Sequence, residues 1–238
     1  MTLYRLNRYS LAALGIVLAI GAILAPSLPY PLRLCAASLL AFFLPGWTLL
    51  QLGWPGLDDL LERLVLAAGL SYGLTVVGSL VLFYVAPSVT LWAAIALLGS
   101  IAATFAAVSY HRRRDISRAD LPGLLDVLFF VAPVAVAAFF SFSNVAYADY
   151  WGDEMNGLLR GMAVLLGHPD AIFTHTKGPV EIILPAVFGL LVGQFDPFTL
   201  RFPSGLALTL GVGSFYLLGR RMLDRNTALL AALLLSVN

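Results

Sequence analysis

Long apolar runs separated by short polar breaks dominate the first 142 residues of the chain. A helix that crosses a membrane needs about 20 predominantly apolar residues. Five runs approach or exceed that length, at residues 9–25, 31–52, 60–85, 89–110 and 121–142. Proline, glycine and aspartate mark the turns between them. The pattern therefore predicts five successive membrane helices joined by short connections.

One long polar stretch, residues 143–179, interrupts the apolar pattern and holds most of the candidate chemistry. Apolar residues recur in it at helical spacing: Met155, Leu158, Leu159, Met162, Leu165 and Leu166. This spacing predicts an amphipathic helix over residues 154–166, with Asp153 as its N-terminal cap. Because that helix directly follows a membrane helix, we expect it to lie along the membrane surface.

Three further apolar segments follow the polar stretch, at residues 180–192, 198–218 and 227–237. The first is short, so two arrangements are open. If it crosses the membrane, about 8 Lys and Arg residues lie inside and about 6 outside. If it only dips into the outer interface, the counts become about 10 and 4. The second arrangement obeys the positive-inside rule better, and it gives six complete crossings followed by a short seventh segment.

The basic residues also predict the orientation of the chain. Arg5 and Arg8 precede the first helix, and the basic run at residues 111–118 follows the fourth. Four crossings separate these two regions, so both lie on one side, which the positive-inside rule makes cytoplasmic. We therefore expect a multi-pass protein of the plasma membrane with a cytoplasmic N-terminus. The stretch 143–179 then faces outward.

The composition agrees with this interpretation and narrows the protein class. The 238 residues are 60% hydrophobic and 11% charged, against roughly 25% charged in soluble domains. We therefore predict an all-α integral membrane protein with about six to eight membrane helices, embedded in the lipid bilayer. No basic stripe interleaved with aromatic residues indicates nucleic-acid binding. The single cysteine, Cys35, excludes an internal disulfide.

The last apolar segment is short. A helix that starts near Thr227 has about 12 residues, or about 18 Å, which is less than a hydrocarbon core of about 30 Å. We therefore expect either that the C-terminus is truncated or that a partner membrane chain completes this helix.

Five short pieces of the second half occur in a fixed order. They are Gly152-Asp153-Glu154, Thr176-Lys177-Gly178-Pro179, Arg201-Phe202-Pro203-Ser204, Leu218-Gly219-Arg220-Arg221 and residues 228–235. In order and spacing, residues 145–238 resemble the start of the GT-C glycosyltransferases, which include the protein O-mannosyltransferases and the lipid A aminoarabinose transferase. That family usually has Lys-Pro-Pro, so Gly178 departs from its pattern.

The resemblance implies transfer of a hexosyl or pentosyl group from a polyprenyl-phosphate donor to an acceptor on the outer face. Asp153 would act as general base, and Glu154 would orient it or the acceptor. Lys177 and Arg201 would neutralise the leaving phosphate, and Trp151 would stack on a sugar ring. Each residue also has a plain structural alternative. Asp153 and Glu154 suit a helix start, and Lys177, Arg201 and Trp151 suit interfacial anchors.

A weaker resemblance covers residues 35–85. Phe43-Leu44-Pro45-Gly46-Trp47, Glu62-Arg63 and Gly69-Leu70-Ser71-Tyr72-Gly73 are similar to an uncharacterised membrane segment that often precedes such transferase regions. It suggests that residues 1–120 form an N-terminal membrane module of four spans. Residues 121–238 would then form the GT-C-like region. Small residues between Gly205 and Gly213 predict close helix packing there.

Other functions stay open at this point. A non-catalytic membrane scaffold or accessory subunit of a larger complex is the main alternative, since enzymes of this group continue well beyond the matching region. A transporter is less consistent with the sequence, because ionisable residues before position 142 lie near helix ends, as Asp126 does. His168, Asp170 and His175 match no standard metal-site spacing. Some enzymes of this group use a divalent cation, so that cofactor also stays open.

Overall fold

The computed structural model describes residues 2–52, 57, 59–86, 88–112, 121–143, 145, 152–174 and 178–237. The backbone alone is described at residues 2–10, 112, 152–154, 169 and 173–174. Regular structure in this part of the chain is helical, which confirms the predicted all-α membrane class. Five described helical segments are long and apolar enough to cross a membrane: Tyr30–Leu50, Leu60–Val85, Leu91–His111, Leu124–Phe142 and Pro197–Met222. Three shorter apolar helices accompany them, at Leu11–Ile23, Pro179–Val192 and Arg225–Ser236.

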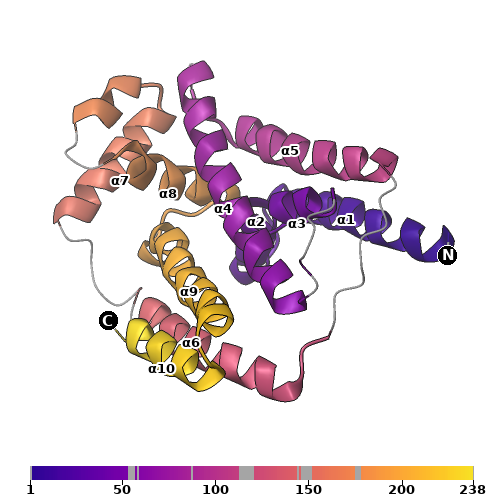
Figure 1. Ribbon diagram of the computed structural model, residues 1–238. Helices are drawn as coiled ribbons and strands as arrows, with labels where there is room; N and C mark the ends of the chain where they lie inside the picture. The colour runs from indigo at the N-terminus through magenta and orange to yellow at the C-terminus, as the bar shows by residue number, and fades with distance from the viewer. Residues whose placement is uncertain are drawn as a thin grey trace.

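The helices coincide closely with the apolar runs of the sequence. Figure 1 shows how they are arranged. In chain order they are α1 (Thr2–Ile23), α2 (Tyr30–Phe42), α3 (Leu44–Leu50), α4 (Leu60–Val85), α5 (Leu91–Arg112), α6 (Leu124–Phe142), α7 (Gly152–Leu165), a 3-10 turn η1 (Pro169–Thr174), α8 (Pro179–Val192), α9 (Pro197–Met222) and α10 (Arg225–Ser236). The predicted helix over 60–85 is confirmed to the residue, and the predicted helix over 31–52 is broken into α2 and α3.

The break between α2 and α3 falls at Phe43, two residues before Pro45. Proline is favoured in the first turn of a helix and cannot continue the preceding one. The new helix is held against α4 by Gly46, whose N–H donates to Ser71 Oγ at 2.7 Å. A Cβ at Gly46 would lie 2.0 Å from the carbonyl oxygen of Ala67. Only glycine permits this approach, so the two glycine-containing motifs of the weaker resemblance form one helix contact.

Buried hydroxyl groups satisfy carbonyls around this break. Thr75 on α4 donates to Ala41 O, and Ser109 on α5 donates to Thr48 O at 3.2 Å. Thr48 itself donates to Leu44 O at 2.9 Å. Broken helices are tolerated at membrane depth where such partners replace the lost backbone bonds.

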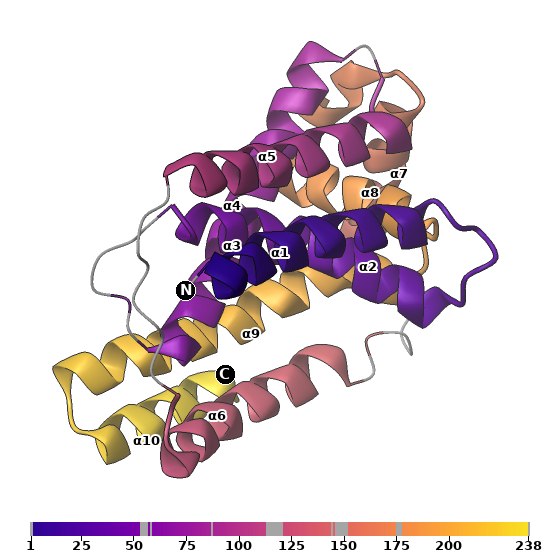
Figure 2. The same cartoon turned by 90° about the vertical axis from the view of Figure 1, so that its right-hand side faces the viewer.

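The helix bundle has two ends that carry different connections (Figure 2). One end, which we call the clasp end, carries the starts of α4, α6 and α10 and the end of α9. The opposite end, which we call the loop end, carries the starts of α2, α5 and α9, together with α7.

Helix α8 makes no net crossing between these ends. Helix α6 runs from the clasp end to the loop end, and α9 returns to the clasp end. The return is fixed by contacts, because Arg220 near the end of α9 pairs with Asp59 at the start of α4. Arg225 at the start of α10 likewise pairs with Asp126 at the start of α6. The structure therefore favours the arrangement in which residues 180–192 do not cross the membrane.

Although short, α8 is largely buried among α2, α4, α5 and α9. Its Phe188 ring stacks on Phe202 of α9 at 5.3 Å and lies 5.2 Å from Phe42 of α2. One apolar core thus joins α1, α2, α4 and α5 to α8, and a smaller one joins α6, α9 and α10 to Leu61. The core does not follow the sequence division at residue 120, which stays a prediction.

The glycines of α9 confirm the predicted close packing. A Cβ at Gly205 would lie 2.8 Å from the Phe142 ring of α6, and one at Gly213 would lie 3.3 Å from Phe130. Small residues on α9 therefore let α6 approach the α9 backbone closely.

Candidate functional site

The predicted acidic pair lies in the first turn of α7. The predicted amphipathic helix is confirmed, and it begins at Gly152 rather than at residue 154. Asp153 and Glu154 therefore belong to the helix itself, so the prediction that Asp153 is the N-terminal cap is wrong. The side chains of both residues are outside the described residues. Trp151 and Lys177 also lie outside the described residues.

Helix α7 packs on α8 at Gly161. A Cβ at Gly161 would lie 3.1 Å from Ala186 Cβ and 3.2 Å from Ile182 O, and Val164 beside it is buried. Leu159 is 61% exposed on the opposite side. One face of α7 thus packs on protein while apolar side chains of the other remain available to lipid, as expected for an interfacial helix.

Arg201 connects α9 to the segment that leads into α7. Its Nη1 donates to the carbonyl oxygen of Val145, three residues after the end of α6. The structure therefore brings Arg201 to the segment between α6 and α7, which precedes the acidic pair.

A polar cluster lies beside Arg201 at the start of α9. Asp196 caps the helix, accepting from Thr199 N at 3.0 Å and from Thr199 Oγ1 at 2.9 Å. The Tyr30 hydroxyl of α2 lies 2.9 Å from Thr199 Oγ1. This chain of hydrogen bonds fixes the start of α2 against the start of α9.

Arg33, one turn after Tyr30, was not singled out by the sequence analysis. Its Nε is buried and has no hydrogen-bond acceptor in the described part of the chain. Its guanidinium packs on the turn after α8, because a Cβ at Gly193 would lie 2.7 Å from Arg33 Nη1. Gly193 has a φ of 75°, a conformation that favours glycine. The available signal was a lone arginine within an apolar helix.

Arg160 of α7 is a second loop-end arginine, and its partners among the described residues are neutral. Its Nε donates to Asn156 Oδ1 at 2.9 Å and its Nη1 to Ala171 O at 3.1 Å. In the part of the chain that the structure describes, neither Arg33 nor Arg160 pairs with a carboxylate.

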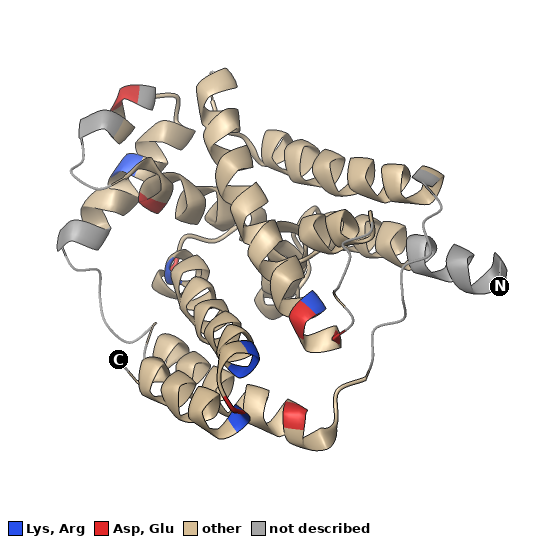
Figure 3. Ribbon diagram, in the orientation of Figure 1, with Lys and Arg blue, Asp and Glu red and all other residues tan. Residues whose placement is uncertain are grey.

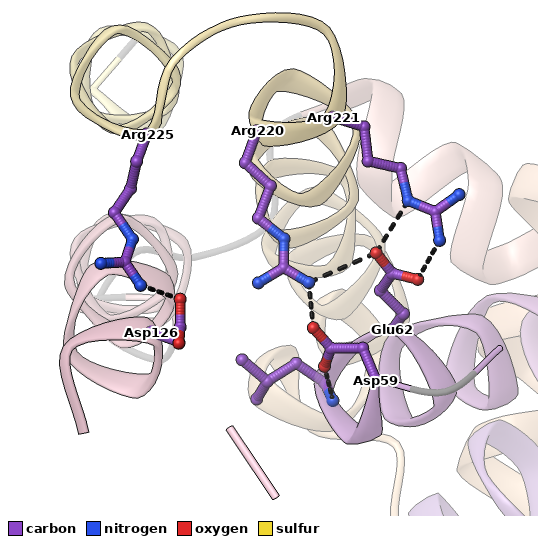
Figure 4. Close-up of polar contacts among 7 residues, drawn as sticks. Asp59, Glu62, Asp126, Arg220, Arg221 and Arg225 are labelled. Carbon is purple, nitrogen blue, oxygen red and sulfur yellow. Dashed lines mark hydrogen bonds and ion pairs between the residues drawn. The ribbon is translucent and has the colours of Figure 1, made fainter. Parts of the chain in front are cut away.

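The clasp end shows the opposite arrangement (Figure 4). The Glu62 carboxylate accepts hydrogen bonds from Arg221 Nε at 2.9 Å and from Arg221 Nη2 at 2.5 Å. Arg220 contacts both Asp59 and Glu62, the latter at 3.3 Å. With the Asp126–Arg225 pair, these contacts form what we call the clasp, which ties α9 and α10 to the starts of α4 and α6.

In the long helices α4, α6 and α9, the charged residues that the structure describes lie near the helix ends, and the middle of these helices is apolar (Figure 3). Among the described residues, no group of three His, Cys, Asp or Glu side chains is placed to hold a metal ion. His168 and Asp170 are exposed, and His175 lies outside the described residues.

Comparisons with protein-family models, with curated proteins and with solved structures found no match to this chain.

Proposed function

We propose that this chain is the membrane part of a glycosyltransferase that takes a sugar from a polyprenyl-phosphate donor at the loop end. The proposal rests on how the arginines at the loop end are paired. Arg33 and Arg160 lack carboxylate partners in the described residues, and the first turn of α7, which holds the acidic pair, lies at the same end. Phosphate recognition needs such cations, and a lipid-linked donor presents its phosphate at the membrane surface.

The resemblance to the GT-C enzymes supplies the roles. The acceptor hydroxyl oxygen attacks the anomeric carbon of the donor sugar, and Asp153 accepts the hydroxyl proton. The bond between that carbon and the phosphate oxygen breaks, so polyprenyl phosphate leaves as an anion. Lys177 and Arg201 stabilise this anion. Glu154 positions the base or acceptor, and Trp151 stacks on the sugar.

Arg33 joins this set as a phosphate-binding residue. A guanidinium with a buried, unpaired N–H carries a desolvation cost that an anionic ligand removes. Arg33 lies outside the region of resemblance, so this role rests on the structure of the N-terminal helices and not on the family.

The orientation belongs to the same proposal. Of the 10 Lys and Arg residues in the described part of the chain, 7 belong to the clasp end and 3 to the loop end. The positive-inside rule then places the clasp end in the cytoplasm of a plasma membrane. The donor would be used on the outer face.

The test is sugar transfer by the purified protein in liposomes that contain radiolabelled polyprenyl-phosphate hexose or pentose. Release of polyprenyl phosphate and labelling of an added acceptor lipid or peptide are measured together. We expect Asp153→Asn to lower the rate by about 10²-fold or more, the usual contribution of a general base. Asp170→Asn, at an exposed carboxylate of η1, is the matched control. A chelator arm tests the divalent-cation alternative.

Two results would overturn the proposal. The first is undiminished transfer by Asp153→Asn. The second is no transfer or donor binding by a folded wild-type protein that co-purifies stoichiometrically with another membrane enzyme. That outcome would make the chain the accessory subunit of the alternative hypothesis.

A further inference from the structure

A groove of about 380 Å³ lies between α1 and α5, away from the loop-end residues. Its walls are Ala13, Ile16, Val17, Ala103, Ala106 and Ala107, and Tyr110 and His111 lie at one end. The α5 wall is recessed because each alanine contributes a single methyl group. Ala103 and Ala107 are exposed, so the groove opens toward the surrounding bilayer.

The groove has the length of one membrane leaflet. From Ala103 to His111 it follows α5 for eight residues, or roughly 12 Å. It ends next to the last residue of α5, Arg112, at the clasp end. Half of a hydrocarbon core measures about 15 Å. The groove therefore extends from the depth of the lipid headgroups toward the middle of the membrane.

The dimensions and the apolar lining of the groove indicate which kind of molecule it binds. Alanine and valine side chains offer no hydrogen bonds, so ordered water is disfavoured along the groove. An α-helix with its side chains is about 10 Å across, and a helix of the same 12 Å length would occupy roughly 900 Å³. A single hydrocarbon chain therefore fits inside the groove, whereas a second helix could contact it with only one face.

The polar end of the groove favours a negatively charged headgroup. His111 is exposed, and its ring lies edge-on to Tyr110 at 5.7 Å. The sequence continues with three arginines, Arg112, Arg113 and Arg114, before the first acidic residue, Asp115. No carboxylate lines the described groove. Basic residues next to a membrane surface attract anionic lipids.

We propose that this groove binds one acyl chain of an anionic phospholipid, whose phosphate lies beside His111 at the clasp end. The site would hold a structural lipid of the leaflet opposite to the one in which the donor is used. It is independent of the glycosyltransferase activity.

The test is lipid retention by the purified full-length chain, measured by native mass spectrometry after extraction and delipidation in mild detergent. Anionic and zwitterionic phospholipids with identical acyl chains are added in competition. We expect the wild type to retain one anionic lipid preferentially. Ala103→Leu should lower that retention about tenfold, because the added side chain displaces about two methylene groups of the lipid.

The matched control is Ala96→Leu, an exposed alanine two turns earlier on α5 and outside the groove. We expect Ala96→Leu to retain lipid like the wild type. Replacing Arg112, Arg113 and Arg114 with Gln should remove the preference for the anionic headgroup and leave zwitterionic lipid bound.

A phospholipid with a photoreactive group in its acyl chain gives a second measurement on the wild type alone. Crosslinks should map to the peptides that contain residues 13–17 and 103–107. Crosslinks that avoid these peptides, or equal retention by Ala103→Leu and wild type, would overturn the proposed site. Equal retention of both headgroups by the wild type would overturn its anionic selectivity.

Discussion

At the clasp end, Arg220, Arg221 and Arg225 each pair with a carboxylate, whereas at the loop end Arg33 and Arg160 pair with none in the described chain. The acidic residues differ in the same way. Glu62 at the clasp end is neutralised by arginine, while Asp196 at the loop end accepts hydrogen bonds from Thr199.

This difference separates two uses of charge in one membrane protein. Paired charges at the clasp end join helices that are far apart in the sequence. Arg220 and Asp59 are separated by 161 positions, and Arg225 and Asp126 by 99. The charges of these arginines are therefore neutralised by carboxylates within the protein. Arginines without a carboxylate still favour an anionic ligand. We therefore assign stability to the clasp end and ligand binding to the loop end.

The largest expected effect concerns the separation of the two ends by the membrane. In a Cys35→Ala background, we expect Gln194→Cys and Leu223→Cys to react with a membrane-impermeant maleimide from opposite sides. The labelling of each site should be all or none, because α9 crosses between them. Reaction of both cysteines from the same side in intact cells would contradict the arrangement of α8 and α9.

The next effect is on stability at the clasp end. Arg220→Leu removes the shared partner of Asp59 and Glu62, and only 11% of the Glu62 side chain is exposed. Loss of a partner from a largely buried ion pair costs about 3 kcal/mol. Reversible unfolding in mixed micelles should show this decrease. Arg221→Leu, at a side chain that is 58% exposed, should cost under about 1 kcal/mol. Equal effects would show that the buried clasp has no special role.

A smaller effect is expected from Gly193→Ala at the loop end. The φ of 75° disfavours alanine, at a cost of about 1–2 kcal/mol. The new Cβ would also displace the Arg33 guanidinium and weaken binding of a polyprenyl phosphate. The control is Gly178→Ala at the other end of α8, where a Cβ meets nothing within 4 Å. Thermal unfolding and lipid binding are measured on both variants, and unchanged binding by Gly193→Ala would separate Gly193 from Arg33.

The smallest effect concerns pH at the start of α10. Hydrogen bonds from Thr227, through its hydroxyl and its backbone N–H, lower the pKa of Asp224 below its usual 3.8. The carboxylate therefore stabilises the folded state above pH 3.8, and this contribution is lost as the pH falls through its lowered value. Amide hydrogen exchange at Asn226 and Thr227, corrected for intrinsic rates, should accelerate in acid. Asp224→Asn should remove that pH dependence. An unchanged acid response in this variant would exclude Asp224 as the titrating group.

The sequence predicted the fold where local patterns decide it. The helix over residues 60–85 lies between Asp59, whose side chain caps it, and Ala86, just before Pro87. The amphipathic pattern was also sufficient to predict α7, although the predicted start, at residue 154, was two residues too late. The break at Phe43 was missed although Pro45 is a local signal for it, because the apolar run continues through Pro45 and the contacts of α3 with Ser71 and Ala67 of α4 cannot be inferred from that run.

The candidate site was predicted less completely for the same reason. Asp153, Lys177 and Arg201 were singled out by their order along the chain, which a resemblance can detect, and their roles stay predictions. Arg33 was missed because its significance depends on what surrounds it. A lone arginine in an apolar helix can be an anchor or a ligand-binding residue. The packing of Gly193 and the lack of an acceptor for Nε among the described residues distinguish the two.

The most direct test of the assignment of ligand binding to the loop end compares Arg33→Gln with Arg221→Gln. For each variant, the affinity for a polyprenyl phosphate in nanodiscs is measured together with the free energy of unfolding. We expect Arg33→Gln to weaken binding about tenfold or more, as loss of a charged hydrogen bond does, with little change in stability. Arg221→Gln should leave binding unchanged. Unchanged binding by Arg33→Gln, or an equal loss in both variants, would contradict the assignment.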